Sequence, residues 1–565
     1  MLPLLLLIPL IGTVAIIFTP AKHAKAIALT ASLFAFIFSV VLGFLFDKWG
    51  TSEFGLTAEI PWFETFCVSL NMGADSVSML LVLLTTLLMP LCVWGSATAI
   101  TERLKEFYSW LLIIETAMVG VFVATDLIFF YVCFELTLIP MFFLIALFGG
   151  ENRAKACIKF FIYTFTGSMI ALVGFLYVAW FHANQTGTWT FDIATLTSAS
   201  QQLVFIPFSM HWNFLGWNIL DIDITAQHLV LLALLAGFAV KVPLFPLHTW
   251  LPLAHTEAPT AGSVLLASVL LKLGTYGLYR FVLPMAPDAV VEWAPFIAVL
   301  SIIGILYTAL ICWVQDDIKK LIAYSSVSHL GFCVLGLFAL NPLGLQGSVL
   351  YMLNHGLSTG ALFFLVGMIY ERYHTRDMNS MSGLSKVMPI WSFFMVFFVL
   401  SSVGLPGLNG FISEFLCLIG TFTASLDNAA YPGVLGPWYA AIAGVGMIFA
   451  AMYLLIMVGK VVFGPLKEPA VHHNVRTLPR DLSFREISIL LPLAVLCVYI
   501  GFRPQPFTEA IEGSIEHVLS PYPARVERLA RQREALLSPS VRELTTVPPE
   551  DTPVDLFREE TNDGG

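Results

Sequence analysis

The chain has 565 residues, of which 58% are hydrophobic and 12% are Asp, Glu, Lys or Arg. Soluble domains carry about 25% charged residues, so this composition excludes a water-soluble protein and indicates one embedded in a membrane. The formal net charge is −10 at pH 7. Because the acidic residues gather in loops and near the carboxyl end, the charge identifies no partner and gives no sign of nucleic-acid binding.

Cysteine usage and the lack of cofactor motifs limit the chemistry of the chain. The eight cysteines lie mostly inside apolar runs, and no two have the C-x-x-C spacing. We therefore expect small buried side chains that neither bind a metal nor form disulfides. The sequence has no nucleotide-binding loop, flavin fingerprint or haem motif, so we expect no cofactor in this chain and any redox chemistry in another.

Fourteen apolar runs are long enough to cross about 30 Å of hydrocarbon. The first begins at Leu2 without the basic n-region of a signal peptide, so we expect it to remain as a membrane helix. The sequence thus predicts an all-α polytopic membrane protein of about fourteen helices. The expected spans are 2–19, 27–46, 76–96, 108–124, 128–149, 156–181, 228–252, 261–283, 289–313, 319–340, 346–370, 390–423, 438–463 and 487–502.

Basic residues in the connecting loops test this count through the positive-inside rule. With the amino terminus outside, sixteen Lys and Arg residues fall in inside loops, whereas the short outside loops hold only Lys48 and Arg280. The loop at 182–227 has 46 residues and no Lys or Arg. Both termini are therefore expected outside, in the periplasm of a bacterial inner membrane. The inside residues are Lys22, Lys25, Arg103, Lys105, Arg153, Lys155, Lys319, Lys320, Arg372, Arg376, Lys386, Lys460, Lys467, Arg476, Arg480 and Arg485.

The segment after the last span, 503–565, is polar and ends in a stretch rich in Pro, Glu and Thr. Its arginines do not contradict the topology, because long tails cross regardless of charge. We expect a short surface helix around 522–537 and disorder in 540–565. We also expect the segment to be a solvated tail rather than to dock on a partner.

An internal repeat relates two apolar segments. Residues 165–177 read FTGSMIALVGFLY and residues 358–370 read STGALFFLVGMIY, with an offset of 193 residues. The segments fall in the sixth and eleventh helices and so cross the membrane in opposite directions. The pattern predicts two inverted five-helix repeats, helices 4–8 and 9–13, as in many secondary transporters. The expected parts are 1–100 with helices 1–3, 101–283 with the first repeat, 284–465 with the second, 466–502 with a loop and helix 14, and the tail 503–565.

Helix breakers stand at corresponding places in the two repeats. The seventh helix reads GFAVKVPLFPLHTWLP, with Lys241 before Pro243, and the twelfth reads SSVGLPGLNGFISEF, with Glu414 after its glycines. Broken membrane helices are tolerated where the freed backbone groups line a cavity. Two matched breaks beside ionisable residues indicate a transport site rather than kinks that serve packing alone.

Few ionisable residues lie inside the expected spans. A charge at bilayer depth costs about 2.5–3.5 kcal/mol on insertion scales, so packing alone does not account for them. Glu135 and Lys241 carry opposite charges, and we expect them to pair. The residues expected to form a proton path are Glu135, Lys241, Lys272, His329, His355 and Glu414. The secondary candidates are His248, seven residues after Lys241, and Glu115.

A static ion bridge is the alternative to a proton path. A lysine gives up its proton readily when it is desolvated, and a histidine passes protons through either ring nitrogen near neutral pH. His329 and His355 lie in chain order between Lys272 and Glu414. The set therefore favours mobile protons over a fixed ion pair.

The run HTWLPLAHTEAPTAGSVLLASVLLKLGTYGLYRF at 248–281 resembles the signature of the M-type antiporter-like subunits of respiratory complex I, the proton-pumping NADH:quinone oxidoreductase. The runs DDIKKLIAYSSVSHLGF at 316–332 and GLPGLNGFISEF at 404–415 are also similar to that family. One departure is Leu253, where the family usually has Asp. The likeness covers roughly residues 70–465.

This resemblance implies a proton-translocating membrane subunit that is coupled to electron transfer in other subunits. Glu135 and Lys241 then belong to a first half-channel and Lys272 to a central relay. The two histidines link this relay to Glu414 in a second half-channel. NADH, FMN, Fe-S clusters and quinone are expected in partner subunits, and L-type and N-type antiporter-like subunits are expected as neighbours in the lipid bilayer.

Two other classes of function stay open. A cation/proton antiporter or a membrane-bound hydrogenase subunit of the same superfamily uses the same charges with sodium or with another electron donor. A structural membrane spacer holds neighbouring modules and moves nothing.

Overall fold

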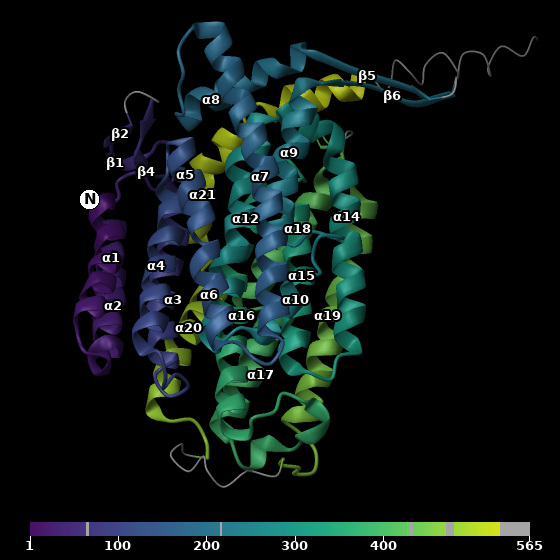
Figure 1. The fold of residues 1–565 in the computed structure, drawn as a ribbon. Coiled ribbons are helices and arrows are strands. Elements are labelled where there is room, and N and C mark those ends of the chain that lie inside the picture. The colour runs from purple at the N-terminus through teal and green to yellow at the C-terminus, as the bar shows by residue number, and fades with distance from the viewer. Residues whose placement is uncertain (64–66, 215–216, 426–427, 429–432, 470–479, 532–565) are drawn as a thin grey trace, which may run out of the picture.

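The computed structural model is a bundle of roughly parallel helices with its strands at one end and loops at both ends (Figure 1). It describes residues 1–565 except 64–66, 215–216, 426–427, 429–432, 470–479 and 532–565. Eleven of the described helices are long and apolar enough to cross a membrane, and three shorter apolar helices accompany them. The expected all-α polytopic membrane fold is therefore confirmed.

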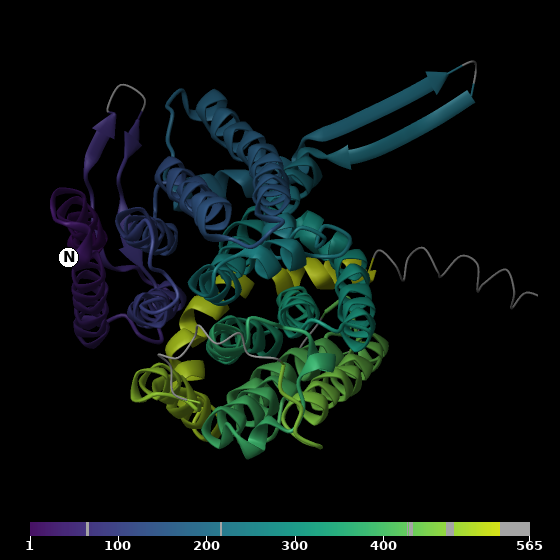
Figure 2. The same cartoon turned by 60° about the horizontal axis from the view of Figure 1, so that its bottom comes forward.

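Three helices and two small sheets form the amino-terminal part. Its elements are α1 (Leu2–Phe18), α2 (Ala24–Leu45), β1 (Gly55–Ala58), β2 (Pro61–Phe63), β3 (Val68–Ser69), β4 (Met72–Ala74) and α3 (Ser76–Gly95). α1 and α2 lie at one edge of the bundle (Figure 2). Strand β1 pairs with β4 and β2 with β3, both antiparallel. Asp75 starts α3 as an N-cap, because its carboxylate accepts a hydrogen bond from the Ser78 amide at 2.9 Å.

The first repeat contains an interrupted series of helices. They are α4 (Leu104–Val123), α5 (Leu127–Leu136), α6 (Leu138–Phe148), α7 (Arg153–Thr186), α9 (Ala226–Lys241), α10 (Leu251–Glu257), α11 (Thr260–Leu265), α12 (Leu271–Gly277) and α13 (Leu283–Met285). Two π-helical turns, Leu266–Leu270 and Leu278–Val282, flank α12. Such turns loosen the backbone locally and are frequent at functional sites.

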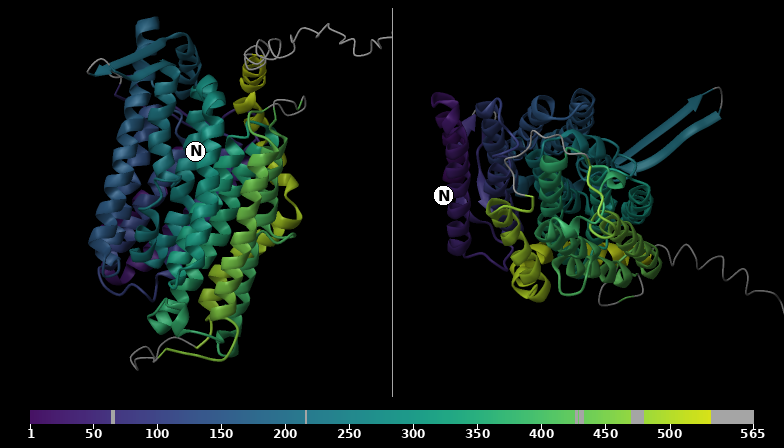
Figure 3. Two further views of the ribbon diagram at one scale, coloured as in Figure 1. Left: turned by 90° about the vertical axis from the view of Figure 1, so that its right-hand side faces the viewer. Right: turned by 90° about the horizontal axis from the view of Figure 1, so that it is seen from below.

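The second repeat and the last membrane helix follow. They are α14 (Pro287–Trp313), α15 (Ile318–Leu337), α16 (Pro342–Tyr373), α17 (Pro389–Val403), α18 (Asn409–Thr423), α19 (Pro437–Val461) and α20 (Phe484–Phe502). Seen from below, these helices form a group beside those of the first repeat (Figure 3). Helix α16 packs against α11, α15, α17, α18 and α20, and its most apolar stretch is fully buried. It is therefore the central helix of this half.

The two predicted helix breaks are confirmed. α9 ends at Lys241 and helix resumes at Leu251 in α10. α17 ends at Val403 and α18 begins at Asn409. In the second break Gly404 and Gly407 have φ angles of +82° and +92°, which glycine adopts without the steric cost of a Cβ atom. The repeated segments 165–177 and 358–370 lie in α7 and α16.

The long loop without basic residues holds structure of its own. It contains α8 (Ile193–Ser200) and the antiparallel pair β5 (Pro207–Phe214) and β6 (Trp217–Thr225). This hairpin projects away from the helices (Figure 2). The strands escape a count of apolar runs, because at 8 and 9 residues they are far shorter than a membrane span.

The segment after α20 docks on the bundle, and the expectation of a solvated tail is wrong for residues 503–531. Helix α21 (Gln505–Leu519) packs against α3 and α16, and Ile511, Ile515 and Val518 are buried. These residues recur every three or four positions, so they form one apolar stripe on an otherwise polar helix. A further helix covers 522–531, while the rest of the predicted helix to 537 and the predicted disorder at 540–565 lie outside the described residues.

The two ends of the bundle differ in what they carry. The hairpin end holds β5, β6, α8 and α21 (Figure 1). The opposite end, called the basic end, holds the loops 96–103, 149–152 and 374–388. Most of the Lys and Arg residues counted as inside in the sequence belong to the basic end.

Candidate functional site

The centre of the candidate site is a contact between Lys272 and His355. Lys272 lies in α12, directly after the π-helical turn Leu266–Leu270. Its Nζ lies 2.7 Å from Nδ1 of His355 on α16 and donates a second hydrogen bond to the carbonyl of Ala267. Both side chains are buried, and Lys272 is 0% exposed. A proton can pass between these two nitrogens, because only one of the two groups needs to be charged at a time.

A second group of contacts continues from His355. The ring of His329, on α15, has its centroid 6.0 Å from that of His355. His329 Nδ1 lies 2.8 Å from the hydroxyl of Tyr351 and 3.3 Å from Oε1 of Glu414. Tyr351 in turn donates a hydrogen bond of 2.7 Å to the same Oε1. The structure thus brings together four of the six predicted residues and adds Tyr351.

A small cavity of about 10 Å³ adjoins this group. That is about the volume one water molecule needs. Within the described part of the chain, Glu414 Oε2 and the Nε2 atoms of His329 and His355 are buried without a hydrogen-bond partner. The cavity is lined by His329, Tyr351, Asn354, His355, Ser358, Thr359, Ser401, Ser402, Gly410, Ser413 and Glu414. A water there would have several polar groups to bind.

Lys241 forms a separate unit at the end of α9. Its Nζ donates a hydrogen bond of 3.3 Å to the Thr137 hydroxyl and lies 4.0 Å from the centroid of the Phe134 ring. The helix that carries Lys272 is adjacent, since a Cβ atom on Gly274 would lie 2.9 Å from Cβ of Lys241. The cation is therefore held by a hydroxyl and an aromatic face, both of which stabilise positive charge away from water.

Glu135 makes no direct ion pair with Lys241, although the two charges lie close enough to attract each other. The expected pairing is therefore present only as an attraction over a longer distance. Glu135 is half-buried on α5, and among the residues that the structure describes it has no ion-pair partner. The reason is helix geometry. Phe134 and Thr137 are three residues apart and share the face that meets Lys241, whereas Glu135 is turned about 100° from Phe134.

The two secondary candidates lie outside the central chain of contacts. His248 lies in the break between α9 and α10, where its ring stacks on Phe245 at 5.7 Å and meets Tyr307 edge-on at 5.9 Å. Glu115 is fully buried in α4, and neither of its carboxylate oxygens has a hydrogen-bond partner in the described structure. Neither residue contacts Lys272, the two histidines or Glu414 through a hydrogen bond.

His255 is a buried residue that the sequence analysis passed over. It lies in α10, is 0% exposed and stacks on Phe363 at 4.6 Å. Both of its ring nitrogens lack a partner in the described part of the chain. The positive charges of Lys319 and Lys272 both act on it electrostatically. The sequence feature that could have singled out His255 is its position in the run AHTEAP, seven residues after His248.

A large cavity of about 740 Å³ opens at the basic end. Its wall includes Glu257, Lys319, Glu371 and Arg376, with further acids from the loops. Lys319, expected at the inside end of the span 319–340, lies in the first turn of α15, is buried and donates a 2.6 Å hydrogen bond to the carbonyl of Ala258. A wall of charged side chains favours water and ions over apolar molecules in this cavity.

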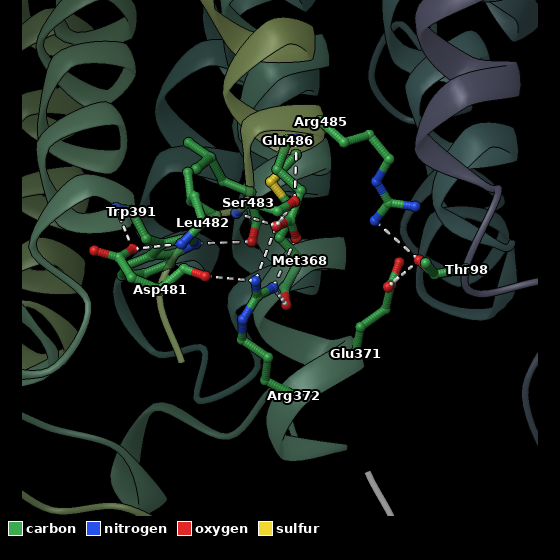
Figure 4. A network of polar contacts seen from close by, with 11 residues as sticks. Thr98, Met368, Glu371, Arg372, Trp391, Asp481, Leu482, Ser483, Arg485 and Glu486 are labelled. Atoms are coloured by element: carbon green, nitrogen blue, oxygen red, sulfur yellow. Dashed lines mark hydrogen bonds and ion pairs between the residues drawn. The ribbon is translucent and has the colours of Figure 1, made fainter. Parts of the chain in front are cut away.

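A buried ion pair fixes the basic end of α16 (Figure 4). Arg372 binds both carboxylate oxygens of Glu486 on α20, at 2.7 and 2.9 Å. Asp481 accepts hydrogen bonds from the first amides of α17, including that of Trp391 at 3.1 Å. Arg485 donates to the Thr98 hydroxyl at 3.0 Å, and that hydroxyl donates to Glu371 at 2.6 Å. Charge-assisted hydrogen bonds of this kind are stronger than neutral ones, so the network holds the basic ends of α16, α17 and α20 together.

A second buried ion pair lies at the hairpin end, above the helix of Lys272. Arg280 binds Asp75 at 2.6 Å and also donates to the Tyr276 hydroxyl at 3.1 Å. Burial raises the pKa of Asp75, but the positive charge of Arg280 and the hydrogen bonds from Ser78 outweigh burial and hold this pKa below its ordinary value. The pair therefore remains charged and ties α3 to the end of the Lys272 helix.

The described residues contain no cluster of three or more His, Cys, Asp or Glu side chains with the spacing of a metal site. The eight cysteines are all free thiols, and seven of them are buried. The only exposed one is Cys67. The ionisable side chains that the site brings together are those of Lys272, His355, His329, Tyr351 and Glu414.

Comparison with known proteins gives a consistent result. Residues 124–437 match the family model described as NADH:quinone oxidoreductase/Mrp antiporter, TM. The chain is 40% identical over 510 residues to NADH-quinone oxidoreductase subunit M of Rhodobacter capsulatus, which covers 90% of this chain and 93% of the relative. It is 39% identical over 523 residues to NADH-ubiquinone oxidoreductase chain 4 of Chondrus crispus, with 92% and 97% covered.

A solved structure extends this likeness to the fold. A chain of respiratory complex I from Thermus thermophilus matches with a TM-score of 0.75 and 28% identity, covering 92% of this chain and 100% of that one. The family model spans more than half of the sequence, and the relatives match along nearly its whole length. The chain therefore belongs to the M-type antiporter-like membrane subunits of NADH:quinone oxidoreductase.

Proposed function

We propose that this chain translocates protons across the membrane as a subunit of NADH:quinone oxidoreductase, with electron transfer in other subunits as the source of energy. The observation that carries the proposal is the buried series of contacts from Lys272 through His355 and His329 to Glu414. A charge alone in hydrocarbon is costly, but a series of titratable neighbours passes a proton on without leaving it isolated.

The proton enters at the basic end in this proposal. The positive-inside rule puts that end on the cytoplasmic side of a bacterial inner membrane and both termini in the periplasm. The cavity of about 740 Å³ then serves as the entrance, since it reaches Lys319 at its wall. From Lys319 the proton passes by way of His255, which has two unpartnered ring nitrogens, to Lys272.

Lys241 and Glu135 control this transfer in the proposal. Lys241 lies against the helix of Lys272 at Gly274. Two positive charges repel each other more strongly in a medium of low dielectric constant than in water. A proton that arrives on Lys241 therefore drives the proton of Lys272 towards His355, and movement of Glu135 towards Lys241 relieves the repulsion. His248 and Glu115 stay secondary members of the same machinery.

The partners in this proposal follow from the family. NADH, FMN, Fe-S clusters and quinone belong to other subunits, and this chain has no redox centre. L-type and N-type antiporter-like subunits are its neighbours in the bilayer. The names of the relatives and of the matched structure, which are those of NADH oxidoreductase subunits and of complex I, support this assignment.

The proposal is tested in the assembled complex. Lys272→Met and Glu414→Gln each remove one titratable group and keep a side chain of similar size. We expect each to lower the number of protons translocated per NADH oxidised in inside-out membrane vesicles, while Lys22→Met, on an exposed residue at the basic end, leaves it unchanged. Unchanged proton translocation in both variants excludes the proposal and supports a structural spacer.

Sodium distinguishes the second candidate class. The matched family model includes Mrp antiporters, so a cation/proton antiporter uses the same fold. Sodium uptake that accompanies NADH oxidation, and that Glu414→Gln abolishes, would assign the chain to that class. Proton translocation that is independent of sodium concentration agrees with the proposed function.

A further inference from the structure

Tyr351 occupies the position between His329 and Glu414. Its hydroxyl lies 2.8 Å from Nδ1 of His329 and donates a 2.7 Å hydrogen bond to Oε1 of Glu414. The ring is buried, 3% exposed, and its centroid lies 6.3 Å from that of His355 one helical turn away. The hydroxyl therefore has an acceptor of protons on one side and a donor on the other.

The direct route from His329 to Glu414 is poorer than the route through Tyr351. His329 Nδ1 and Glu414 Oε1 are 3.3 Å apart, whereas charge-assisted N–H···O bonds have lengths of about 2.7–2.9 Å. Both contacts of the Tyr351 hydroxyl are shorter than the direct one. A phenylalanine fills the same space, so packing does not require the hydroxyl, which is costly to bury unless it is hydrogen-bonded.

The internal repeat shows that this tyrosine is not a general feature of the fold. An offset of 193 residues relates Tyr351 to Ile158 and His355 to Ile162 in the first repeat. Both isoleucines are exposed on α7, at 52% and 56%. The corresponding face of α7 is thus apolar, and only the second repeat carries a hydroxyl and an imidazole there.

We propose that Tyr351 is a relay residue that carries the proton from His329 to Glu414. The inference rests on the proposed function and names a step within it. The Nδ1–H bond of the His329 imidazolium breaks as a bond forms to the Tyr351 oxygen, and the Tyr351 O–H bond breaks as a bond forms to Glu414 Oε1. His329 becomes neutral, Glu414 becomes a carboxylic acid, and Tyr351 is neutral before and after.

The relay resets without any further reactant. Glu414 loses its proton from the carboxyl group into the small cavity beside Oε2. The Tyr351 hydroxyl, whose hydrogen then points to His329, rotates about its C–O bond back towards the carboxylate. His329 is left with its proton on Nε2 and a bare Nδ1, so its ring turns about the Cβ–Cγ bond and exchanges the places of the two nitrogens. The bare nitrogen, now on the side where Nε2 had no partner in the described structure, takes the next proton, and the imidazolium turns back to its starting position.

The test compares two substitutions in the assembled complex. Tyr351→Phe removes the hydroxyl and keeps the ring. Tyr351→Gln also removes the O–H group but leaves a neutral polar side chain, which is shorter than that of tyrosine. We expect both to slow proton translocation about tenfold, the size of a lost hydrogen bond to a charged group. Tyr108→Phe is the matched control. It removes a buried hydroxyl on α4 that has no hydrogen-bond partner in the described structure, and it is expected to have no effect.

The outcomes separate this inference from the proposed function. If Glu414→Gln slows translocation but Tyr351→Phe stays within twofold of the native rate, the relay is excluded and the proposed function stands. A native rate in Tyr351→Gln together with a slow Tyr351→Phe shows that Tyr351 only positions Glu414, which also excludes the relay.

A spectroscopic measurement checks the contact without turnover. The carboxylic acid band of Glu414 is assigned in infrared difference spectra by its loss in Glu414→Gln. We expect Tyr351→Phe to move this C=O band to higher wavenumber, because the carboxyl group loses a hydrogen bond. A band at the native position means that the hydroxyl does not bind Glu414 and overturns the inference even if the variant assembles poorly.

Discussion

The side chain of Lys241 starts directly over Gly274, two residues after Lys272. A Cβ atom on Gly274 would lie 2.9 Å from Cβ of Lys241 and 2.8 Å from the amide nitrogen of Val242. Both distances are shorter than real Cβ contacts, and one of the neighbours is backbone. The glycine thus lets the end of α9 approach the helix that carries the central lysine.

Gly274→Ala is expected to separate these two helices. The added methyl group must displace backbone, and overpacking of this kind costs about 1–3 kcal/mol. We expect a lower melting temperature of the purified complex and slower proton translocation. Gly444→Ala in α19 is the matched control, because a Cβ atom there meets nothing within 4 Å. Equal effects of the two substitutions would contradict a role for this close approach.

Asp75→Asn tests the ion pair at the hairpin end. The pKa of Asp75 is lower in the folded protein than its ordinary value, so the pair stabilises the fold at every pH above the unfolded carboxyl pKa of about 3.9. That stability is lost only as the pH falls through the lowered pKa. Asp75→Asn leaves Arg280 buried without a charged partner, which costs about 3–5 kcal/mol.

The lowered pKa of Asp75 in the folded protein determines how the stability difference depends on pH. The melting temperature of Asp75→Asn lies below that of the native complex by a constant amount between about pH 5 and pH 8, and the difference shrinks below about pH 4. Calorimetry of the detergent-purified complex measures it. A difference that changes across the neutral range would mean that another group titrates with the pair.

The Arg372–Glu486 pair predicts a strong coupling between α16 and α20. Because both side chains are nearly buried, Glu486→Gln leaves the guanidinium of Arg372 with a neutral partner and destabilises the complex by about 3–5 kcal/mol. Arg372→Met is expected to cost a similar amount. The double variant is expected to cost less than the two single costs together. Additive costs in a double-mutant cycle, measured by thermal unfolding, would exclude the coupling.

We expect the melting temperature of the complex to depend on how much of the docked carboxyl-terminal segment is present. Tyr522 donates a 2.7 Å hydrogen bond to the carbonyl of Leu283, and Arg525 pairs with Asp288 at 2.8 Å. Arg528 binds the same carboxylate. A chain that ends at residue 519 loses these contacts and is expected to melt at a lower temperature, whereas a chain that ends at 531 keeps them. Identical melting of the two truncations would show that the contacts add no stability.

Much of the fold is predictable from the sequence, because membrane spans and basic loops follow from the cost of putting charge and backbone into hydrocarbon. The two helix breaks at Pro243 and at Gly404 could also be predicted, because the breakers stand inside apolar spans. The hairpin 207–225 and the docking of α21 could not be predicted. Short strands have no span-like signature, and the stripe of Ile511, Ile515 and Val518 is short enough to pass for part of a solvated helix.

The candidate site was predictable as a list of residues but not as a set of contacts. The rarity of charge in the spans singled out Lys272 and Glu414. The rotation of the helix about its axis places Thr137 rather than Glu135 against Lys241. Counting apolar spans does not predict this rotation. Tyr351 was hidden because tyrosine is common in apolar spans, and only its two hydrogen bonds distinguish it.

The docked segment also constrains how the molecule can move. From α20 it crosses α3 and α16 and ends on Asp288 of α14, so one strap joins the amino-terminal helix α3 to the second repeat at the hairpin end. A body tied at one end pivots there. Any rocking of the second repeat against the amino-terminal helices therefore has its small amplitude at the strap and its large amplitude at the basic end, where the wide cavity lies. Paired spin labels at the two ends would show this difference as unequal changes in distance during turnover.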